Sequence, residues 1–110
     1  MLTDGHHARG LSLGRIATVL ASAPAEAMGL GHRKGRIAVG LDADLAIVDL
    51  DREYLYRRED VRSSAGYSIY QGRRFKGQAV HTLVRGRLVV RDGAPIDGAV
   101  GTGRYVSREL

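Results

Sequence analysis

Two β-prone runs joined by a single two-residue link constrain the fold more than any other feature of this sequence. The first run ends at Val84 and the second begins at Arg87, which leaves only Arg85 and Gly86 to reverse the chain. A link this short requires positive φ angles, which glycine adopts without a steric penalty. The sequence therefore predicts an antiparallel hairpin over about residues 78–91.

A short, continuous apolar run predicts a further strand ahead of this hairpin. The run extends from Leu45 to Val48 and is flanked by aspartates. A run without alternation of polar and apolar residues is typical of a strand buried on both faces. Residues 51–64 are charged and show no periodicity, whereas Asp92-Gly93 predicts a second turn after the hairpin.

The first part of the chain is predicted to be helical. Ser12 can cap a helix, and the apolar residues that follow it recur on one face. These residues are Leu13, Ile16, Ala17 and Leu20. We expect this helix at about residues 12–22. Pro24 suits the start of a second helix at about residues 24–29, because its missing N–H would lack a partner there in any case. Gly29 can end that helix in the left-handed conformation.

The order of these elements predicts an α+β fold, because helices come first, strands follow, and no strand–helix–strand alternation occurs. The 110 residues suffice for one domain. Aromatic residues make up 5% of the chain, so a core must consist of aliphatic side chains and would give modest stability. The absence of cysteine excludes disulfides, zinc–thiolate sites and thiol nucleophiles.

The chain carries a formal net charge of +5, which is compatible with nucleic-acid binding. Its basic residues are nevertheless spread along the whole chain beside acidic ones. The densest run, His32 to Arg36, lacks the interleaved aromatic residues that stack on bases, and we interpret it as a solvated loop. The best case for a nucleic-acid partner is a mixed aromatic and basic cluster, which we do not favour as a site. Its members are Tyr67, Tyr70, Arg73, Arg74, Phe75 and Lys76.

No targeting or membrane-spanning segment is predicted. No apolar run approaches the roughly 18 residues that cross a bilayer. Residues 1–10 contain Asp4 and two histidines instead of the apolar centre of a signal peptide. We therefore expect a cytoplasmic protein with no membrane partner.

The histidines and the acidic pair are the candidate metal ligands. His6 and His7 are adjacent, so their side chains point apart on any regular element, and no acidic residue is spaced to complete a site. His32 and His81 are isolated in the sequence. The motif Asp42-Ala43-Asp44 resembles an acidic metal-binding pair, but it lies between a glycine turn and a predicted strand. Because aspartate favours turns, we interpret this pair as structural.

The remaining motifs do not predict a catalytic or cofactor-binding site. The segment from Gly98 to Gly103 resembles a phosphate-binding loop only in its glycine content, because it lacks the Gly-Lys-Ser/Thr sequence. Ser63, Ser64 and Ser68 lack the Gly-x-Ser-x-Gly context of an activated nucleophile. The sequence therefore predicts no catalytic, no cofactor-binding and no metal-binding residue.

The order of several short motifs is more informative than their individual chemistry. They are Gly10-Leu11-Ser12-Leu13, Ala23-Pro24-Ala25, Gly35 to Val48, Ser63 to Gly72, Lys76 to Val80, Thr82 to Gly93 and Gly103 to Val106. In this order and spacing the chain resembles the amidohydrolase superfamily, and within it the dihydroorotase, hydantoinase (dihydropyrimidinase) and allantoinase group. It departs from that pattern at Ala23, where asparagine is common, at Ile69, where proline is usual, and at Gln71, where glutamate is usual.

The resemblance implies a (β/α)₈ barrel and a smaller β-sandwich built from both chain ends. Residues 1–32 would be the tail of the barrel, and residues 33–110 the C-terminal part of the sandwich. A whole barrel needs about 250 residues and is therefore absent from this chain. The family's His-x-His, bridging lysine, further histidines and catalytic aspartate would lie upstream, together with the zinc or other divalent metal that they bind. No position of this chain matches one of them.

Two functions remain open at this point. The first is a C-terminal fragment or split subunit of a metal-dependent enzyme that hydrolyses C–N bonds of cyclic amides or ureides, with the missing barrel portion as its partner. Members of the family are often homo-oligomers. Because the metal ligands are absent, we expect the chain to be inactive alone, and whether it counts as an enzyme is left open. Met1 to Gly5 resembles a segment inside the family's last barrel unit, so we expect the rest of the barrel to be encoded upstream. The alternative is a free-standing basic β module that binds a protein or a polyanion.

Overall fold

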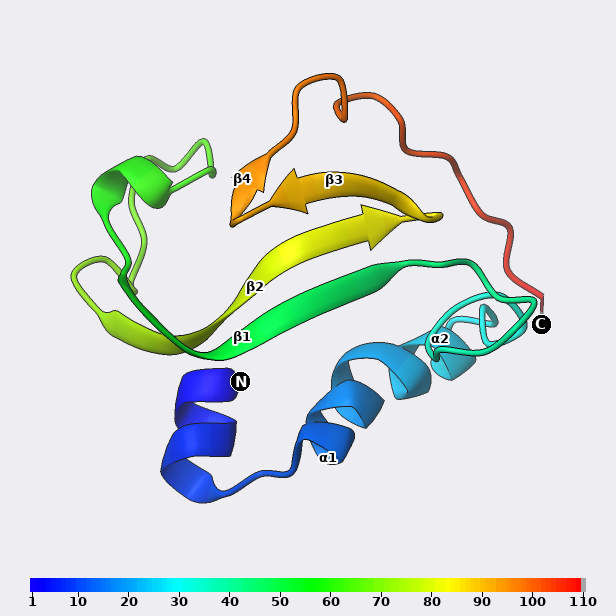
Figure 1. The fold of residues 1–110 in the computed structure, drawn as a ribbon, viewed down its shortest axis with the longest axis horizontal. Helices are drawn as coiled ribbons and strands as arrows, with labels where there is room; N and C mark the ends of the chain where they lie inside the picture. Colours follow the sequence, from blue (N-terminus) through cyan, green and yellow to red (C-terminus); the bar gives the residue numbers. More distant parts are fainter. Residues whose placement is uncertain (110) are drawn as a thin grey trace.

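The computed structural model describes residues 1–109, in which helical segments precede a four-stranded antiparallel sheet (Figure 1). The helical segments are η1 (Leu2–His7), α1 (Leu13–Ala17), η2 (Thr18–Ser22), α2 (Ala23–Ala27) and the short η3 (Arg58–Asp60). The strands are β1 (Leu45–Leu55), β2 (Arg74–Val84), β3 (Arg87–Arg91) and β4 (Ala94–Pro95). This order agrees with the α+β fold predicted from the sequence.

The two helices predicted at about 12–22 and 24–29 form one continuous helical stretch instead. Ser12 caps it as predicted, because its hydroxyl oxygen accepts a hydrogen bond of 3.2 Å from the Arg15 N–H. The helix does not stop before Pro24. The preceding segment η2 is a wider π-helix, and such a turn accommodates a residue that has no N–H to donate. α2 then ends at Ala27, two residues before Gly29, which has the expected positive φ of 68°.

The π-helix η1 was not predicted, because its residues show no apolar periodicity. Contacts with the sheet hold it in place. The Thr3 hydroxyl donates to the Lys76 carbonyl at 3.0 Å and accepts from the Lys76 N–H at 2.9 Å. His7 Nε2 lies 2.8 Å from the Leu50 carbonyl oxygen. Both contacts join residues that are far apart in the sequence, so local sequence patterns do not reveal them.

The predicted hairpin is confirmed as the β2–β3 pair. Val84 pairs with Arg87, and the link between them is Arg85-Gly86 with φ angles of 48° and 76°. Positive φ at both central residues is the geometry of a type I′ turn, whose twist matches that of the flanking strands. A second link with positive φ, at Asp92-Gly93, joins β3 to β4.

Strand β1 is longer than the predicted apolar run and is less buried. It continues to Leu55 because its charged second half pairs with β2, from Glu53–Lys76 to Leu55–Arg74. The prediction of burial on both faces is not met within this chain, where Ile47 is 49% exposed and Val48 39% exposed.

The described residues enclose almost no hydrophobic core. Only Ile16 and Ala25 are buried hydrophobic residues, with 7% and 8% exposure. The accessible surface is 8158 Å², whereas a folded monomer of this mass exposes about 5,900 Å². The Cα radius of gyration is 15.5 Å, against about 13 Å for a compact domain of this length. In Figure 1, α1 and α2 run alongside β1, and of the helical segments η1 makes the hydrogen bonds to the sheet described above.

None of the helices formed by residues 1–109 combines the length and the apolar character needed to cross a membrane.

Candidate functional site

The carboxylates of Asp42 and Asp44 form ion pairs with neighbouring basic side chains. Lys34 Nζ lies 2.8 Å from an Asp42 carboxylate oxygen and also forms an ion pair with Asp44. Arg33 also forms an ion pair with Asp42, at 3.0 Å, and completes a cluster of four charged residues. All of these charges come from the segment between α2 and β1. The cluster therefore closes that segment on itself.

The same acidic pair also holds the β2–β3 turn. The Asp44 carboxylate accepts a hydrogen bond of 2.7 Å from the Arg85 N–H, and the Ala43 carbonyl accepts one of 2.9 Å from the Gly86 N–H. These bonds fix the turn against the start of β1. The arrangement fits the structural interpretation of the Asp42-Ala43-Asp44 motif and leaves little of either carboxylate for a metal ion.

The charges of the cluster shift one another's titration. Hydrogen bonds to Asp42 and then Asp44 raise the pKa of the Lys34 ammonium above its ordinary value. The hydrogen bond from Lys34 lowers the pKa of the Asp42 carboxyl. Burial alone would raise the pKa of Asp44, but hydrogen bonds from Lys34 and from the Arg85 N–H outweigh it, and the net shift is downward. Each group is thus held in its charged form.

The histidines are dispersed over separate backbone contacts. His6 Nδ1 lies 2.9 Å from the Leu11 carbonyl oxygen, whereas His7 contacts Leu50 in β1. His81 accepts a hydrogen bond from the Asp92 N–H across the hairpin, and His32 lies beside Glu109 near the C-terminus. Within residues 1–109, no three His, Cys, Asp or Glu side chains gather closely enough to hold a metal ion.

The aromatic and basic cluster packs on itself. Phe75 is stacked against Tyr54 with ring centroids 5.4 Å apart, and Tyr56 and Tyr70 meet it edge-on at 6.3 and 6.0 Å. The Arg73 guanidinium lies 5.3 Å from the Phe75 centroid. Burial raises the pKa of Tyr54. Because these rings contact one another, they are not arranged as a platform on which bases could stack. Tyr67, the other aromatic member, is not among these contacts.

The serines and the glycine-rich segment have local roles. Ser63 Oγ accepts a hydrogen bond from the Ala65 N–H, and Ser68 Oγ accepts one from the Tyr70 N–H, each at 3.2 Å. Both are turn contacts of the kind that serine commonly makes. The segment from Gly98 to Gly103 is a loop, as predicted, with no helix after it.

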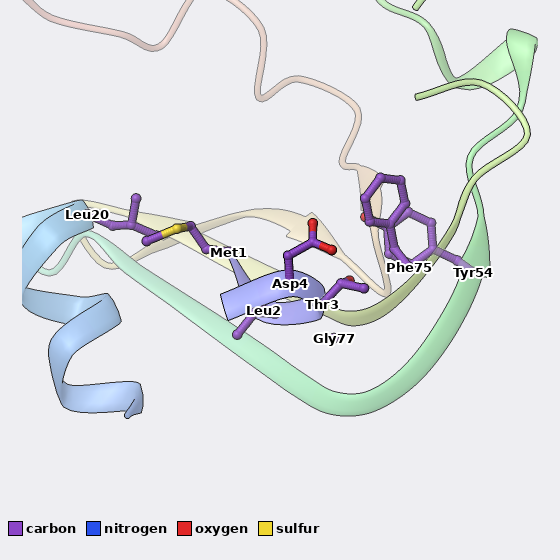
Figure 2. Close-up of a pocket in the computed structure, with 8 residues that line it drawn as sticks. All are labelled: Met1, Leu2, Thr3, Asp4, Leu20, Tyr54, Phe75 and Gly77. Carbon is purple, nitrogen blue, oxygen red and sulfur yellow. The ribbon is translucent and has the colours of Figure 1, made fainter. Parts of the chain in front are cut away.

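An apolar hollow lies where the N-terminal helix meets the sheet (Figure 2). Its volume is about 360 Å³. The lining residues are Met1, Leu2, Thr3, Asp4, Leu20, Tyr54, Phe75 and Gly77. Asp4 is neutralised by an ion pair with Arg73. The hollow therefore offers apolar contact area and no group arranged for catalysis.

Gly77 is a contact residue that sequence reasoning missed. It has φ 87°, and a β-carbon built on it would lie 2.8 Å from the Leu2 β-carbon. Only glycine allows β2 to approach the N-terminal helix this closely. The signal in the sequence was a glycine inside a strand, which often marks a close backbone approach.

Comparisons with known proteins match this chain to a family model and to curated relatives. A family model described as "Amidohydrolase family" matches residues 4–90. The chain is 41% identical over 101 residues to an allantoinase of Rubrobacter xylanophilus, covering 92% of this chain and 22% of that protein. It is 41% identical over 99 residues to a dihydroorotase of Methanothermobacter thermautotrophicus, covering 90% and 22%.

A solved structure gives the same result for the fold. The L-hydantoinase (dihydropyrimidinase) from Arthrobacter aurescens superposes with a TM-score of 0.81 at 38% sequence identity. The superposition covers 87% of this chain and 21% of that protein. The chain thus spans about 22% of the length of the curated relatives it matches.

Proposed function

We propose that this chain, which belongs to the amidohydrolase family, forms the C-terminal segment of a metal-dependent cyclic amidohydrolase. The reaction of the whole enzyme would be the hydrolysis of a C–N bond in a cyclic amide or ureide. The substrate class would be that of dihydroorotate, hydantoin or dihydropyrimidine, or allantoin. The named relatives are an allantoinase, a dihydroorotase and hydantoinases.

One observation carries this proposal, namely that nearly the whole chain matches only about a fifth of each relative. A free-standing module would be expected to close its own core, but residues 1–109 bury only Ile16 and Ala25. The exposed apolar side chains are those that a larger protein would cover. A segment of a larger enzyme accounts for both the short match and the open surface.

The side chains of this chain indicate which parts of the whole enzyme it would supply. Residues 1–32 would complete the end of the barrel, and residues 33–110 would form part of the small β-sandwich. The family's metal does not fit residues 1–109, which gather no set of ligands for it. Those ligands and the catalytic groups would come from the barrel portion. The chain would then act through packing and would have no activity by itself.

The experiment measures hydrolysis of dihydroorotate, hydantoin and allantoin by this chain, with and without added zinc. We expect no turnover by the chain alone and turnover of at least one substrate when the barrel portion is co-expressed with it. The barrel portion expressed without this chain is the matched control. Zinc-dependent turnover by the chain alone that a chelator abolishes would contradict the proposal.

The alternative of a free-standing basic β module has less support. Arg33 and Lys34, in the densest basic run, are paired with Asp42 and Asp44 rather than left for a polyanion. Phe75 is enclosed by its aromatic neighbours. Co-purification with a barrel-containing chain favours the enzyme segment, whereas binding to a polyanion that weakens steeply with salt favours the module.

A further inference from the structure

A second hollow, of about 390 Å³, lies between the β2–β3 turn and the C-terminal loop. Three arginines line it. Arg85 lies in the turn, Arg87 directly follows the turn, and Arg104 follows the glycine-rich loop. Val84 and Val89 add an apolar part to its wall. The lining contains no acidic residue, so the hollow is strongly positive.

These three arginines, like several others in the chain, have no acidic partner, but they lie together in the lining of one hollow. Arg33, Arg57 and Arg73 each form an ion pair with a carboxylate. Across residues 1–109, no ion pair joins any of the three arginines of the hollow to an acidic side chain. Their positive charges are brought together and are left without compensation.

Two of the three side chains are already held in place. Arg85 Nη2 donates to the Thr102 carbonyl at 2.7 Å, and Arg87 Nη2 donates to the Gly98 carbonyl at 3.2 Å. A guanidinium has five N–H donors, so each keeps most of its hydrogen-bonding capacity after one such bond. Because the side chains are anchored, a ligand would lose less conformational entropy in ordering them.

The backbone conformation of Arg85 also indicates that its side chain has a role. Its φ is 48°, in the left-handed region that asparagine, aspartate and glycine adopt more readily than arginine. The turn alone would be better served by asparagine. An arginine in this strained position suggests that its side chain, and not only its backbone, is used.

We propose that Arg85, Arg87 and Arg104 form a binding site for a small, multiply charged oxyanion of the phosphate class. The planar fork of each guanidinium matches the oxygens of a phosphate group and can bind it through two parallel hydrogen bonds. Three such groups around one hollow favour a ligand with more than one negative charge. The site is separate from the packing role proposed above and does not depend on it.

The test is a titration of the 110-residue chain with inorganic phosphate, followed by the backbone amide signals of Gly86, Gly101 and Gly103 in ¹H–¹⁵N NMR. Sodium chloride at equal ionic strength is the reference titration. At about pH 7 a phosphate group carries more than one negative charge. We expect saturable shifts confined to the turn and the loop, with half-saturation on the order of millimolar.

Three variants separate binding from folding. Among residues 1–109, the Arg104 side chain makes no hydrogen bond to the loop. Arg104→Gln should therefore weaken phosphate binding about threefold or more without disturbing the loop. Arg15→Gln removes the same charge from the exposed face of α1 and should leave the affinity unchanged. Arg85→Asn should keep or raise the melting temperature, because asparagine suits the turn, while it weakens binding.

Several outcomes would overturn the site. They are shifts that chloride reproduces, shifts that do not saturate, or equal affinities of the Arg104→Gln and Arg15→Gln variants. Loss of binding in Arg85→Asn accompanied by unfolding would point to a purely structural role for that side chain, and the Arg104 comparison then decides. None of these results bears on the hydrolysis experiment, so the two proposals fail independently.

Discussion

At the residue scale, the fold depends on a few positions where one side chain, or its absence, sets a long-range contact. Gly77 admits the N-terminal helix to the sheet because a β-carbon there would lie 2.8 Å from the Leu2 β-carbon. Asp44 joins the start of β1 to the β2–β3 turn through the Arg85 N–H. Each of these residues connects parts of the chain that are far apart in the sequence.

Gly77→Ala should destabilise the chain by about 1–3 kcal/mol, because it combines a positive φ with a clash against Leu2. Gly40→Ala is the matched control. Gly40 has a similar φ of 91°, but a β-carbon there meets nothing within 4 Å. Urea unfolding of both variants provides the comparison, and an equal loss of stability in the two would contradict the close contact.

The charged cluster predicts a pH dependence on both sides of neutrality. The pKa values of Asp42 and Asp44 are lowered, so their contribution is complete above the ordinary value of 3.8 and is lost as the pH falls through the folded-state pKa. The pKa of Lys34 is raised from 10.5, so its contribution is complete below that value and is lost at higher pH.

Asp44→Asn tests the acid side of this dependence. The difference in unfolding free energy between the wild type and the variant should be largest between about pH 5 and 9 and should shrink below about pH 3. Urea unfolding across that range measures it. A difference that stays constant into acid would mean that the charge of Asp44 contributes nothing.

At the scale of elements, local chemistry predicted some features and long-range contacts determined others. The β2–β3 hairpin could be predicted because Arg85-Gly86 leaves only one way to reverse the chain in two residues. The length of β1 could not, because residues beyond Val48 are charged and become a strand only by pairing with β2. The π-helix η1 was missed for the same reason, since its anchor at Lys76 is 73 residues away from Thr3.

The same distinction between local sequence information and long-range contacts applies to the candidate sites. The structural role of the Asp42-Ala43-Asp44 motif followed from its position between a turn and a strand, which is local information. The arginine hollow was not predicted, because Arg85 and Arg104 lie far apart in the sequence. The hairpin and the C-terminal loop are joined by the hydrogen bonds of Arg85 to the Thr102 carbonyl and of Arg87 to the Gly98 carbonyl.

Gly86→Val should destabilise the β2–β3 hairpin by about 1–3 kcal/mol, because a β-branched residue resists the φ of 76° found there. The melting temperature should fall by several degrees. Gly103→Val is the control, since Gly103 lacks the positive φ and a β-carbon on it would meet nothing within 4 Å. An unchanged melting temperature for Gly86→Val would count against the tight turn.

At the scale of the whole molecule, the dominant feature is apolar surface that residues 1–109 do not cover. The helix stripe predicted to pack inward is only partly buried, because Ile16 is enclosed while Leu20 is 60% exposed. The accessible area exceeds that of a compact monomer by roughly a third. In the proposed enzyme, the barrel portion would cover this surface.

Leu20→Ser should therefore change the stability of the isolated chain by less than about 0.5 kcal/mol, since this side chain is mostly in water. The same change should weaken association with the barrel portion about tenfold, because it removes apolar area from the interface. Val100→Ser, on the C-terminal loop, is the control for an exposed apolar residue outside the helix stripe. Equal effects of the two on association would contradict the assignment of this face.

We propose that this chain is one segment of a cyclic amidohydrolase, and the DNA upstream of the Met1 codon, read in all frames, provides the test. We expect it to encode the remainder of an amidohydrolase barrel, with a His-x-His near its start, unless a separate gene supplies one. A genome in which no upstream frame and no other gene encodes such a barrel would contradict it.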